Sequence, residues 1–164
     1  MNSKARPLRK VISGGQTGVD RGGLDAAIAA KIQHGGWCPQ GRRAEDGVIP
    51  RGYRLKPTES ADYKVRTERN VADADATLIL CRGPMTGGTL LTRNIAAAYD
   101  QALLVIDLNQ ASEEPESAVD DVVLWLYDNR IRVLNVAGPR ESQQPGIAAE
   151  AREFLLRVFD KAAD

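Results

Sequence analysis

The feature that most constrains this chain is a glycine-rich turn, Ser13-Gly14-Gly15-Gln16-Thr17-Gly18, between a short apolar stretch at residues 8–12 and an alanine-rich helical stretch. Glycines at this density let the backbone turn sharply and approach a ligand closely. A helix that begins just after such a turn presents unpaired N–H groups and the positive end of its dipole to an anion. The pattern predicts a ligand site within the first 25 residues.

Strand-like and helix-like segments alternate along the rest of the chain. Apolar runs typical of strands lie at residues 8–12, 76–81, 103–106 and 131–136, and helical spacing is found at 24–32, 63–74, 89–99, 116–128 and 145–159. This alternation predicts an α/β fold of one domain, residues 1–164, with a mostly parallel sheet flanked by helices. Residues 35–58 are rich in glycine, proline and arginine, and we expect a short strand and a long, partly structured loop there.

The composition excludes several classes of protein. The 22 basic residues balance the 22 acidic ones, so the sequence gives no reason to expect binding to nucleic acid or to a membrane surface. No segment reaches the ~20 apolar residues of a membrane span, and we expect a cytoplasmic protein. Cys38 and Cys81 have no second ligand at metal-binding spacing, so we expect buried thiols and neither a disulfide nor a metal site.

Two further loops follow strands in the same way as the first. They are residues 82–89, after the strand at 76–81, and residues 138–142, after the last strand. In open α/β sheets ligands bind outside the carboxyl ends of the strands, where the strand order reverses. The hydroxyl, amide and guanidinium donors of these loops favour a phosphate or an oxyanion. The candidate binding residues are Gly14, Gly15, Gln16, Thr17, Gly18, Asp20, Arg82, Thr86, Gly87, Gly88, Thr89, Arg140 and Ser142.

Other polar residues allow two interpretations. Arg66 and Asn70 are spaced i, i+4 and share one helix face, which is at least as well explained by a solvated surface as by a ligand. The four arginines at 42, 43, 51 and 54 could cover a polyanion or serve solubility. His34 is expected to end a helix. A glycine-rich turn can also serve packing alone.

The sequence assigns no catalytic residue. It lacks a Gly-x-Ser-x-Gly elbow, a zinc-hydrolase motif and a Walker lysine, and it offers no nucleophile. Asp20, Asp25 and Glu141 are the acids nearest the first loop. Asp20 could act as a base or hold a cation, and a helix cap explains it equally well. Binding is therefore better supported than catalysis.

Six segments carry a resemblance to a known family. They are Ser13-Gly14-Gly15-Gln16-Thr17-Gly18-Val19-Asp20-Arg21-Gly22-Gly23-Leu24-Asp25, Gly36-Trp37-Cys38-Pro39, Arg66-Thr67-x-x-Asn70-Val71, Asp75-Ala76-Thr77-Leu78-Ile79, Thr86-Gly87-Gly88-Thr89 and Gly138-Pro139-Arg140-Glu141-Ser142. In this order, and over most of the chain, they resemble the putative molybdenum carrier family, the circularly permuted YpsA-like branch of the SLOG Rossmann-like superfamily.

The resemblance implies a Rossmann-like fold, assembly into a homo-oligomer (a dimer or a tetramer), and binding of the molybdenum cofactor or a related phosphate-bearing, nucleotide-like ligand. Carrier members hold and protect the cofactor without transforming it. Carried over onto this chain, the binding positions are Gly14, Gly15, Gln16, Thr17, Gly18, Thr86, Gly87, Gly88 and Thr89.

The same superfamily contains lysine-decarboxylase-like phosphoribohydrolases, which cleave the N-glycosidic bond of nucleotides. Those enzymes carry a Pro-Gly-Gly-x-Gly-Thr-x-x-Glu loop. The nearest segment here, Thr86-Gly87-Gly88-Thr89-Leu90-Leu91-Thr92, lacks the second Gly-Thr pair and the glutamate. We therefore expect a small-molecule binding protein rather than an enzyme, and a nucleotide N-glycoside phosphoribohydrolase is the alternative. A purely structural assembly subunit, which would bind no ligand, is a third possibility.

Overall fold

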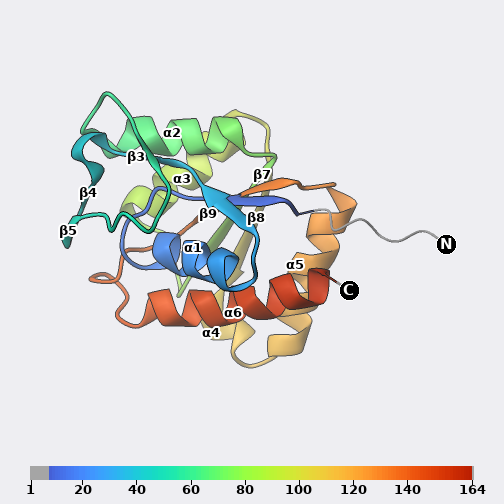
Figure 1. The fold of residues 1–164 in the computed structure, drawn as a ribbon. Coiled ribbons are helices and arrows are strands. Elements are labelled where there is room, and N and C mark those ends of the chain that lie inside the picture. The colour runs from blue at the N-terminus through green and yellow to red at the C-terminus, as the bar shows by residue number, and fades with distance from the viewer. Residues whose placement is uncertain (1–7, 164) are drawn as a thin grey trace.

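The computed structural model describes residues 8–163, and its centre is a parallel sheet of five strands in the order β2-β1-β9-β7-β8 (Figure 1). The five strands are β1 (Lys10–Ile12), β2 (Gln33–Gly35), β7 (Ala76–Cys81), β8 (Ala102–Asp107) and β9 (Val133–Ala137). The helices are α1 (Val19–Ala29), α2 (Tyr63–Asp73), α3 (Gly87–Ala98), α4 (Leu108–Ala111), α5 (Pro115–Asp128) and α6 (Ile147–Ala162). The predicted α/β class and mostly parallel sheet are confirmed.

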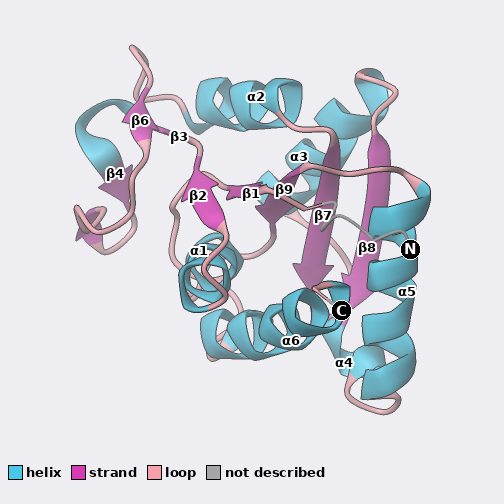
Figure 2. Cartoon of the chain, turned by 45° about the vertical axis from the view of Figure 1, so that its right-hand side comes forward, coloured by secondary structure: helices cyan, strands magenta, loops and turns pink. Residues whose placement is uncertain are grey.

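Helices cover both faces of this sheet (Figure 2). On one face α6 packs against α1 and α5, and on the other α2 packs against α3. The apolar runs explain this arrangement, because all six side chains of β7 are buried between the two helical layers. Among residues 8–163, no helix combines the length and the apolar character that crossing a membrane requires.

The last strand of the chain lies in the middle of the sheet. β9 is hydrogen-bonded to β1 on one side and to β7 on the other, and Asn135 is paired with both Ile12 and Thr77. From β1 the chain crosses through α1 outward to β2, and from β7 it crosses through α3 outward in the other direction to β8. The strand order therefore reverses around β9, and the carboxyl ends of β1, β9 and β7 frame the position where such sheets bind ligands.

Several predicted boundaries differ from the structure. The α1 helix ends at Ala29, before residue 32, because Lys31 adopts a left-handed φ of 58°. His34 does not end that helix but lies in the edge strand β2, where its Nε2 accepts a hydrogen bond from Arg54 N (3.1 Å). The α3 helix begins at Gly87 rather than at residue 89. Cys38 and Cys81 are buried free thiols, as predicted.

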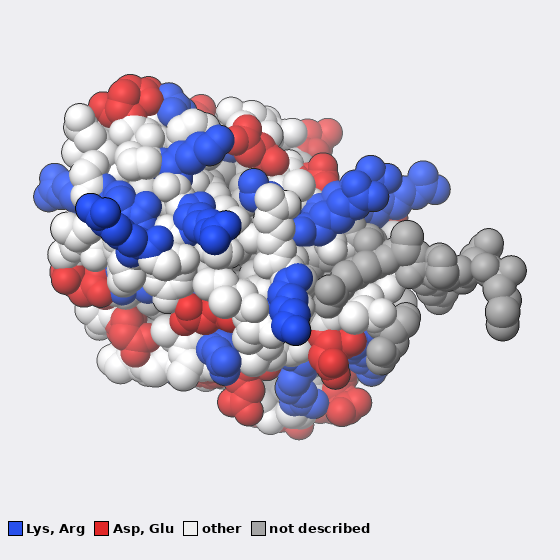
Figure 3. Space-filling view, in the orientation of Figure 1, with Lys and Arg blue, Asp and Glu red and all other residues white. Residues whose placement is uncertain are grey.

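Residues 36–58 form a separate arm beside the sheet. It contains the parallel pair β3 (Trp37–Cys38) and β6 (Lys56–Pro57), a short 3₁₀ turn (Gln40–Arg42), and the antiparallel pair β4 (Arg43–Ala44) and β5 (Gly47–Val48). Figure 3 shows basic side chains gathered over the part of this face where the arm lies. The expectation of a short strand and a partly structured loop is confirmed.

Arg42 organises the arm from within. Its guanidinium donates to four backbone carbonyls: Pro50 O (2.8 Å), Tyr53 O (2.9 Å), Ile49 O (3.2 Å) and Leu55 O (3.2 Å). Ile49 and Leu55 in turn bury their side chains against Leu24 and Cys38. The sequence suggested that the arginines of this region cover a polyanion or serve solubility. Arg42 does neither, because its guanidinium donors are used inside the loop.

The first prediction concerns this internal arginine. Arg42→Ala removes charge-assisted bonds to four carbonyls, and we expect it to lower the free energy of unfolding in urea by about 2 kcal/mol. Arg43→Ala, at the exposed neighbouring position, serves as the control and should change stability by less than ~0.5 kcal/mol. Equal stabilities of the two variants would contradict the role given to Arg42.

Candidate functional site

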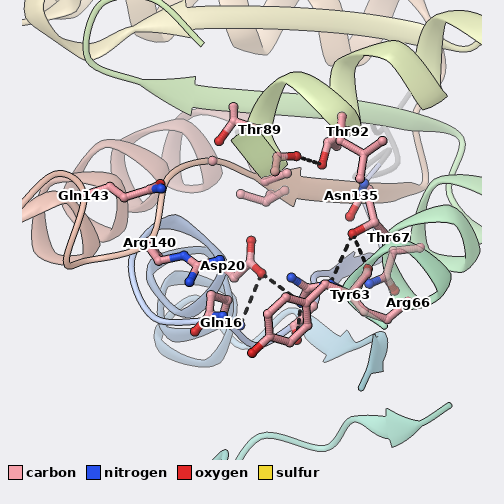
Figure 4. Close-up of a pocket in the computed structure, with 17 residues that line it drawn as sticks. Gln16, Asp20, Tyr63, Arg66, Thr67, Thr89, Thr92, Asn135, Arg140 and Gln143 are labelled. Carbon is pink, nitrogen blue, oxygen red and sulfur yellow. Dashed lines mark hydrogen bonds and ion pairs between the residues drawn. The ribbon is translucent and has the colours of Figure 1, made fainter. Parts of the chain in front are cut away.

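A pocket opens where the strand order reverses (Figure 4). It lies between the loop after β1, helix α2, the start of α3, and the end of β9 with the loop that follows. We call it the switch pocket, and it is lined by Gly14, Gln16, Asp20, Tyr63, Arg66, Thr67, Asn70, Gly88, Thr89, Leu91, Thr92, Asn135, Val136, Ala137, Gly138, Arg140 and Gln143. Its cavity volume of about 80 Å³ is far below the ~300–1,000 Å³ typical of pockets that enclose a whole ligand. A cavity of this size has room for only one end of such a ligand.

The first turn of α3 forms one wall of the switch pocket. Gly88 and Thr89 line the pocket, and Thr89 is 5% exposed. Among the described residues, no atom lies within 4 Å of the position that a Cβ on Gly87 or Gly88 would take. The backbone at Gly87 and Gly88 can therefore be approached closely, whereas Thr89 N and Leu90 N donate to Thr86 O (3.2 Å and 3.4 Å). The helix dipole favours an anion at this end.

Two arginines and a tyrosine form the cationic wall. The guanidinium carbons of Arg66 and Arg140 lie 5.3 Å and 5.9 Å from the centroid of the Tyr63 ring. Arg66 Nη1 donates to Gly14 O (2.8 Å). A Cβ on Gly14 would lie 1.9 Å from that nitrogen, so residue 14 must be glycine for Arg66 to occupy this place. The first glycine of the motif thus serves an arginine contributed by α2.

The side chain of Gln16 is held in one orientation at the floor of the pocket. Its Oε1 accepts hydrogen bonds from Thr17 N (3.1 Å) and Glu45 N (2.9 Å). Gln16 is 6% exposed, and within residues 8–163 its Nε2 is a buried donor without a partner. A buried polar group left unpaired costs stability of the order of 1–3 kcal/mol, so such a group in a native protein indicates a ligand or a water.

Asp20 places a carboxyl group in the same pocket. The residue is 6% exposed, and its Oδ2 accepts from Gln16 N (3.2 Å) and lies 3.5 Å from Arg66 Nη1. Burial raises the pKa of Asp20 from 3.8 to about 6, against the opposing effect of Arg66. This carboxyl group can therefore exchange a proton close to neutral pH, which is typical of groups at functional sites.

The candidate residues from the sequence fall into two groups. Those that line the switch pocket are Gly14, Gln16, Asp20, Gly88, Thr89 and Arg140. Those outside its lining are Gly15, Thr17, Gly18, Arg82, Thr86, Gly87 and Ser142. Thr86 is the N-cap residue of α3 and Gly87 is its first residue, so both are next to the pocket wall.

The remaining outlying candidates have structural contacts of their own. Gly18 has a φ of 83°, and a Cβ there would lie 2.2 Å from Pro139 O. Gly15 faces Ile49 and Leu55 of the arm. Arg82 forms an ion pair with Glu150 (2.5 Å) and also donates to Pro145 O. These glycines and this arginine hold loops against each other.

Thr17 and Ser142 both bind the arm instead of the pocket. The Glu45 carboxylate accepts from the hydroxyls of Thr17 and Ser142 and from Ser142 N (3.1 Å). Glu141, another acid close to the first loop in the sequence-based prediction, uses its carboxylate to accept from Gly146 N (2.5 Å) and Ala148 N (3.0 Å) at the start of α6. One arm residue, Glu45, thus joins the loops that follow β1 and β9.

Sequence reasoning missed part of the lining. The sequence pattern did not point to Tyr63, Thr67, Thr92, Asn135 or Gln143, and it left the Arg66–Asn70 helix face balanced against a solvated surface. Asn70 holds β3 by accepting from Trp37 N (2.8 Å) and donating to Trp37 O (3.0 Å). The one available signal was Asn135, a polar residue within an apolar strand, whose Nδ2 donates to Thr77 Oγ1 (3.2 Å).

The comparisons with known proteins agree with this arrangement. Residues 11–159 match the family model of the circularly permutated YpsA SLOG family. A crystal structure of a putative molybdenum carrier protein from Syntrophus aciditrophicus SB is 43% identical in sequence, with a TM-score of 0.84 over 93% of this chain and 95% of that chain. Among curated proteins, none matches.

The second prediction follows from the burial of Asp20. Because its folded pKa is raised, the folded protein keeps a proton between pH 4 and 6 that the unfolded chain has lost, so stability falls as the pH rises through that window. Asp20→Asn cannot ionise. The wild type loses this stability as the pH rises and the variant does not. The unfolding free energy of the variant minus that of the wild type should therefore increase by about 2–3 kcal/mol between pH 4 and pH 7. Urea denaturation across this range measures the change, and a constant difference would contradict the raised pKa.

Proposed function

The chain belongs to the circularly permutated YpsA SLOG family, and from that premise we propose that it is a binding protein for the molybdenum cofactor or a related phosphate-bearing, nucleotide-like ligand. The observation that carries the proposal is the position of the switch pocket at the reversal of the strand order, with two guanidinium groups and a helix start among the described residues that line it. These groups are hydrogen-bond donors that converge from three separate segments of the chain.

The phosphate of such a ligand fits the donors in the walls of the switch pocket. Arg66 and Arg140 supply guanidinium groups, which favour a phosphate. Arg66 already donates from Nε to Thr67 Oγ1 (3.2 Å) and from Nη1 to Gly14 O (2.8 Å). The first turn of α3 adds backbone N–H groups and a favourable dipole on the facing wall. Because the net charge of the chain is zero, this attraction for an anion is local to the pocket.

The molybdenum cofactor would be cargo for this protein, and the residues present fit it. Its phosphate would be held by Arg66, Arg140 and the α3 start. Carrying requires a site that holds and shields its ligand, and the candidate residues supply binding groups without an evident nucleophile. A carrier or sensor role therefore accounts for more of the pocket than a reaction does.

Asp20 supports a second candidate function. A carboxyl group with a pKa near 6 inside the pocket is suited to general acid or base chemistry, as cleavage of a nucleotide N-glycosidic bond needs. Glu141 is used at the start of α6, so Asp20 would carry this activity. A nucleotide phosphoribohydrolase is therefore the alternative.

We also retain the prediction of a homo-oligomer in the cytoplasm. Leu90 and Tyr99, within and just after α3, are 37% and 48% exposed, and Val105 of the edge strand β8 is 37% exposed. Apolar side chains exposed along a helix and an edge strand support association with another copy.

The third prediction tests the site directly. Gly88→Asp places a negative charge at the α3 start, where the added side chain has room, so the protein should fold while repelling a phosphate. In native mass spectrometry of protein from a molybdenum-replete host, we expect wild type to retain a pterin- or nucleotide-sized adduct and this variant to lose it. Asn94→Asp, an equal charge change on the exposed part of α3, is the control and should retain the adduct.

The same samples separate the two functions. A carrier returns its ligand unchanged, whereas a hydrolase releases free base from a nucleoside monophosphate, and Asp20→Asn should abolish that release. An adduct retained equally by wild type and Gly88→Asp would place the ligand elsewhere and contradict the proposed site. The oligomeric mass is read from the same spectra.

A further inference from the structure

The switch pocket combines cations that attract an anion with a buried carboxyl group that repels one. Resting on the proposed function, we propose that the pocket selects oxyanions that carry a proton, such as hydrogen phosphate, over fully ionised oxyanions such as sulfate, and that Asp20 is the residue that determines this choice. Hydrogen phosphate and sulfate are both tetrahedral dianions, and they differ in the single proton that hydrogen phosphate carries. In the bound state the oxyanion and the Asp20 carboxyl group together hold one proton.

The first step in the argument is the position of the Asp20 side chain. It lines the switch pocket from the first turn of α1, and it is 9% exposed. In Figure 4 one carboxylate oxygen faces Gln16 and Arg66, and the other points away from them, toward the side of the pocket where Thr89 lies. The cavity volume of about 80 Å³ is room for several waters or for one tetrahedral oxyanion. An oxyanion that enters the cavity therefore lies close to this carboxyl group.

The charged groups around the carboxyl group come from several elements. Those that favour its ionised form are Arg66 of α2, Arg21 of α1, and the backbone N–H groups of Gly14 and Gln16. Within residues 8–163, the lining from α3 and β9 carries no charge, and Tyr63 and Arg140 are the other titratable residues of the pocket lining. Burial outweighs the favourable contacts and raises the pKa of Asp20 from 3.8 to about 6. The carboxyl group is therefore mostly ionised at pH 7.5, and a proton can be added to it at small cost.

Arg140 is the cation of the pocket with donors left for an anion. Its guanidinium carbon lies 5.9 Å from the centroid of the Tyr63 ring, and among residues 8–163 the guanidinium has no hydrogen-bond or ion-pair partner. Arg66 Nη1, by contrast, donates to Gly14 O (2.8 Å) and faces Asp20 Oδ2 (3.5 Å). Part of the charge of Arg66 is therefore already balanced by Asp20, and an incoming anion competes with that carboxylate.

Sulfate and hydrogen phosphate differ in how they meet an ionised Asp20. A buried carboxylate and an adjacent anion repel each other strongly, because little water screens the two charges. Sulfate has no proton to offer, so it binds only after Asp20 has taken up a proton from solution. Hydrogen phosphate instead donates its own O–H to the carboxylate and forms a charge-assisted hydrogen bond. Sites that pair with a donor on the ligand reject the analogue that lacks this donor.

The same rule applies to the phosphate group of a nucleotide-like ligand. The second pKa of a phosphate monoester is about 6, so this group also keeps or gains a proton at small cost near neutral pH. The pocket then holds one proton between two groups of similar pKa. Molybdate carries no proton at neutral pH and should bind as weakly as sulfate. The pocket therefore favours the phosphate end of a ligand over a free metal oxyanion.

The first experiment needs no variant. We measure binding of inorganic phosphate, sulfate and molybdate to the full chain by isothermal titration calorimetry at constant ionic strength. At pH 7.5 phosphate should bind at least tenfold more tightly than sulfate or molybdate. Between pH 6.5 and pH 7.5 the affinity for sulfate should fall by roughly tenfold, with uptake of about one proton measured in buffers of different ionisation enthalpy.

The variant Asp20→Asn tests the residue. Asparagine keeps an oxygen for Gln16 N and replaces the ionisable oxygen with an NH₂ donor, which suits a fully ionised oxyanion. At pH 7.5 sulfate should bind this variant at least tenfold more tightly than it binds wild type, and its affinity should change little between pH 6.5 and pH 7.5. Glu68→Gln removes the same charge from an exposed position of α2 outside the pocket lining and should keep the wild-type preference. Urea denaturation confirms that both variants are folded.

The outcomes separate this inference from the proposed function. If wild type binds sulfate or molybdate as tightly as phosphate at pH 7.5, or if the preference for phosphate survives in Asp20→Asn, the inference is overturned and anion binding stands. If none of the three anions binds while wild type retains its adduct in native mass spectrometry, the inference fails and the proposed function stands. If wild type binds none of the anions and retains no adduct, both fail.

Discussion

The pairing of β9 between β1 and β7 is the constraint on which the rest of this structure depends. It brings the loop after the last strand against the glycine turn after the first one. The contact is close: a Cβ on Gly138 would lie 2.2 Å from Leu80 O, and one on Gly18 would lie 2.2 Å from Pro139 O. Backbone packed this tightly leaves the polar side chains of both loops few alternative places, so the pocket is built on rigid elements.

Because of this packing, some loop residues hold chain segments together and others line the pocket. Gly15, Gly18 and Gly138 are needed where chain segments touch, whereas Gly88 borders open space at a helix start. Thr17 and Ser142 carry the hydroxyls expected of a phosphate cradle but donate them to Glu45 of the arm. The groups that line the switch pocket therefore come in part from side chains whose positions depend on neighbours distant in sequence, such as Arg66 against Gly14.

The strands at 8–12, 76–81, 103–106 and 131–136 could be predicted because periodicity and apolar runs are local properties of the sequence. The edge strand β2 could not, since Gln33-His34-Gly35 has no apolar pattern and gains its hydrogen bonds from β1. The loops of the candidate site could be located at strand ends. The α2 wall could not, because an i, i+4 pair such as Arg66 and Asn70 looks the same on a solvated face and on a pocket wall. The arm residue Glu45 left no signal, as its importance arises from contacts with Gln16, Thr17 and Ser142.

The central place of β9 also bears on how the molecule comes to be folded. During synthesis β1, β2, β7 and β8 emerge before the strand that joins the two pairs, so each pair has one side of its ladder open until residues 133–137 arrive. The contacts of β9 with β1 span most of the chain, and contacts of such large sequence separation form late and slowly. The switch pocket is therefore among the last features to appear, and it exists only in a chain whose sheet has already closed.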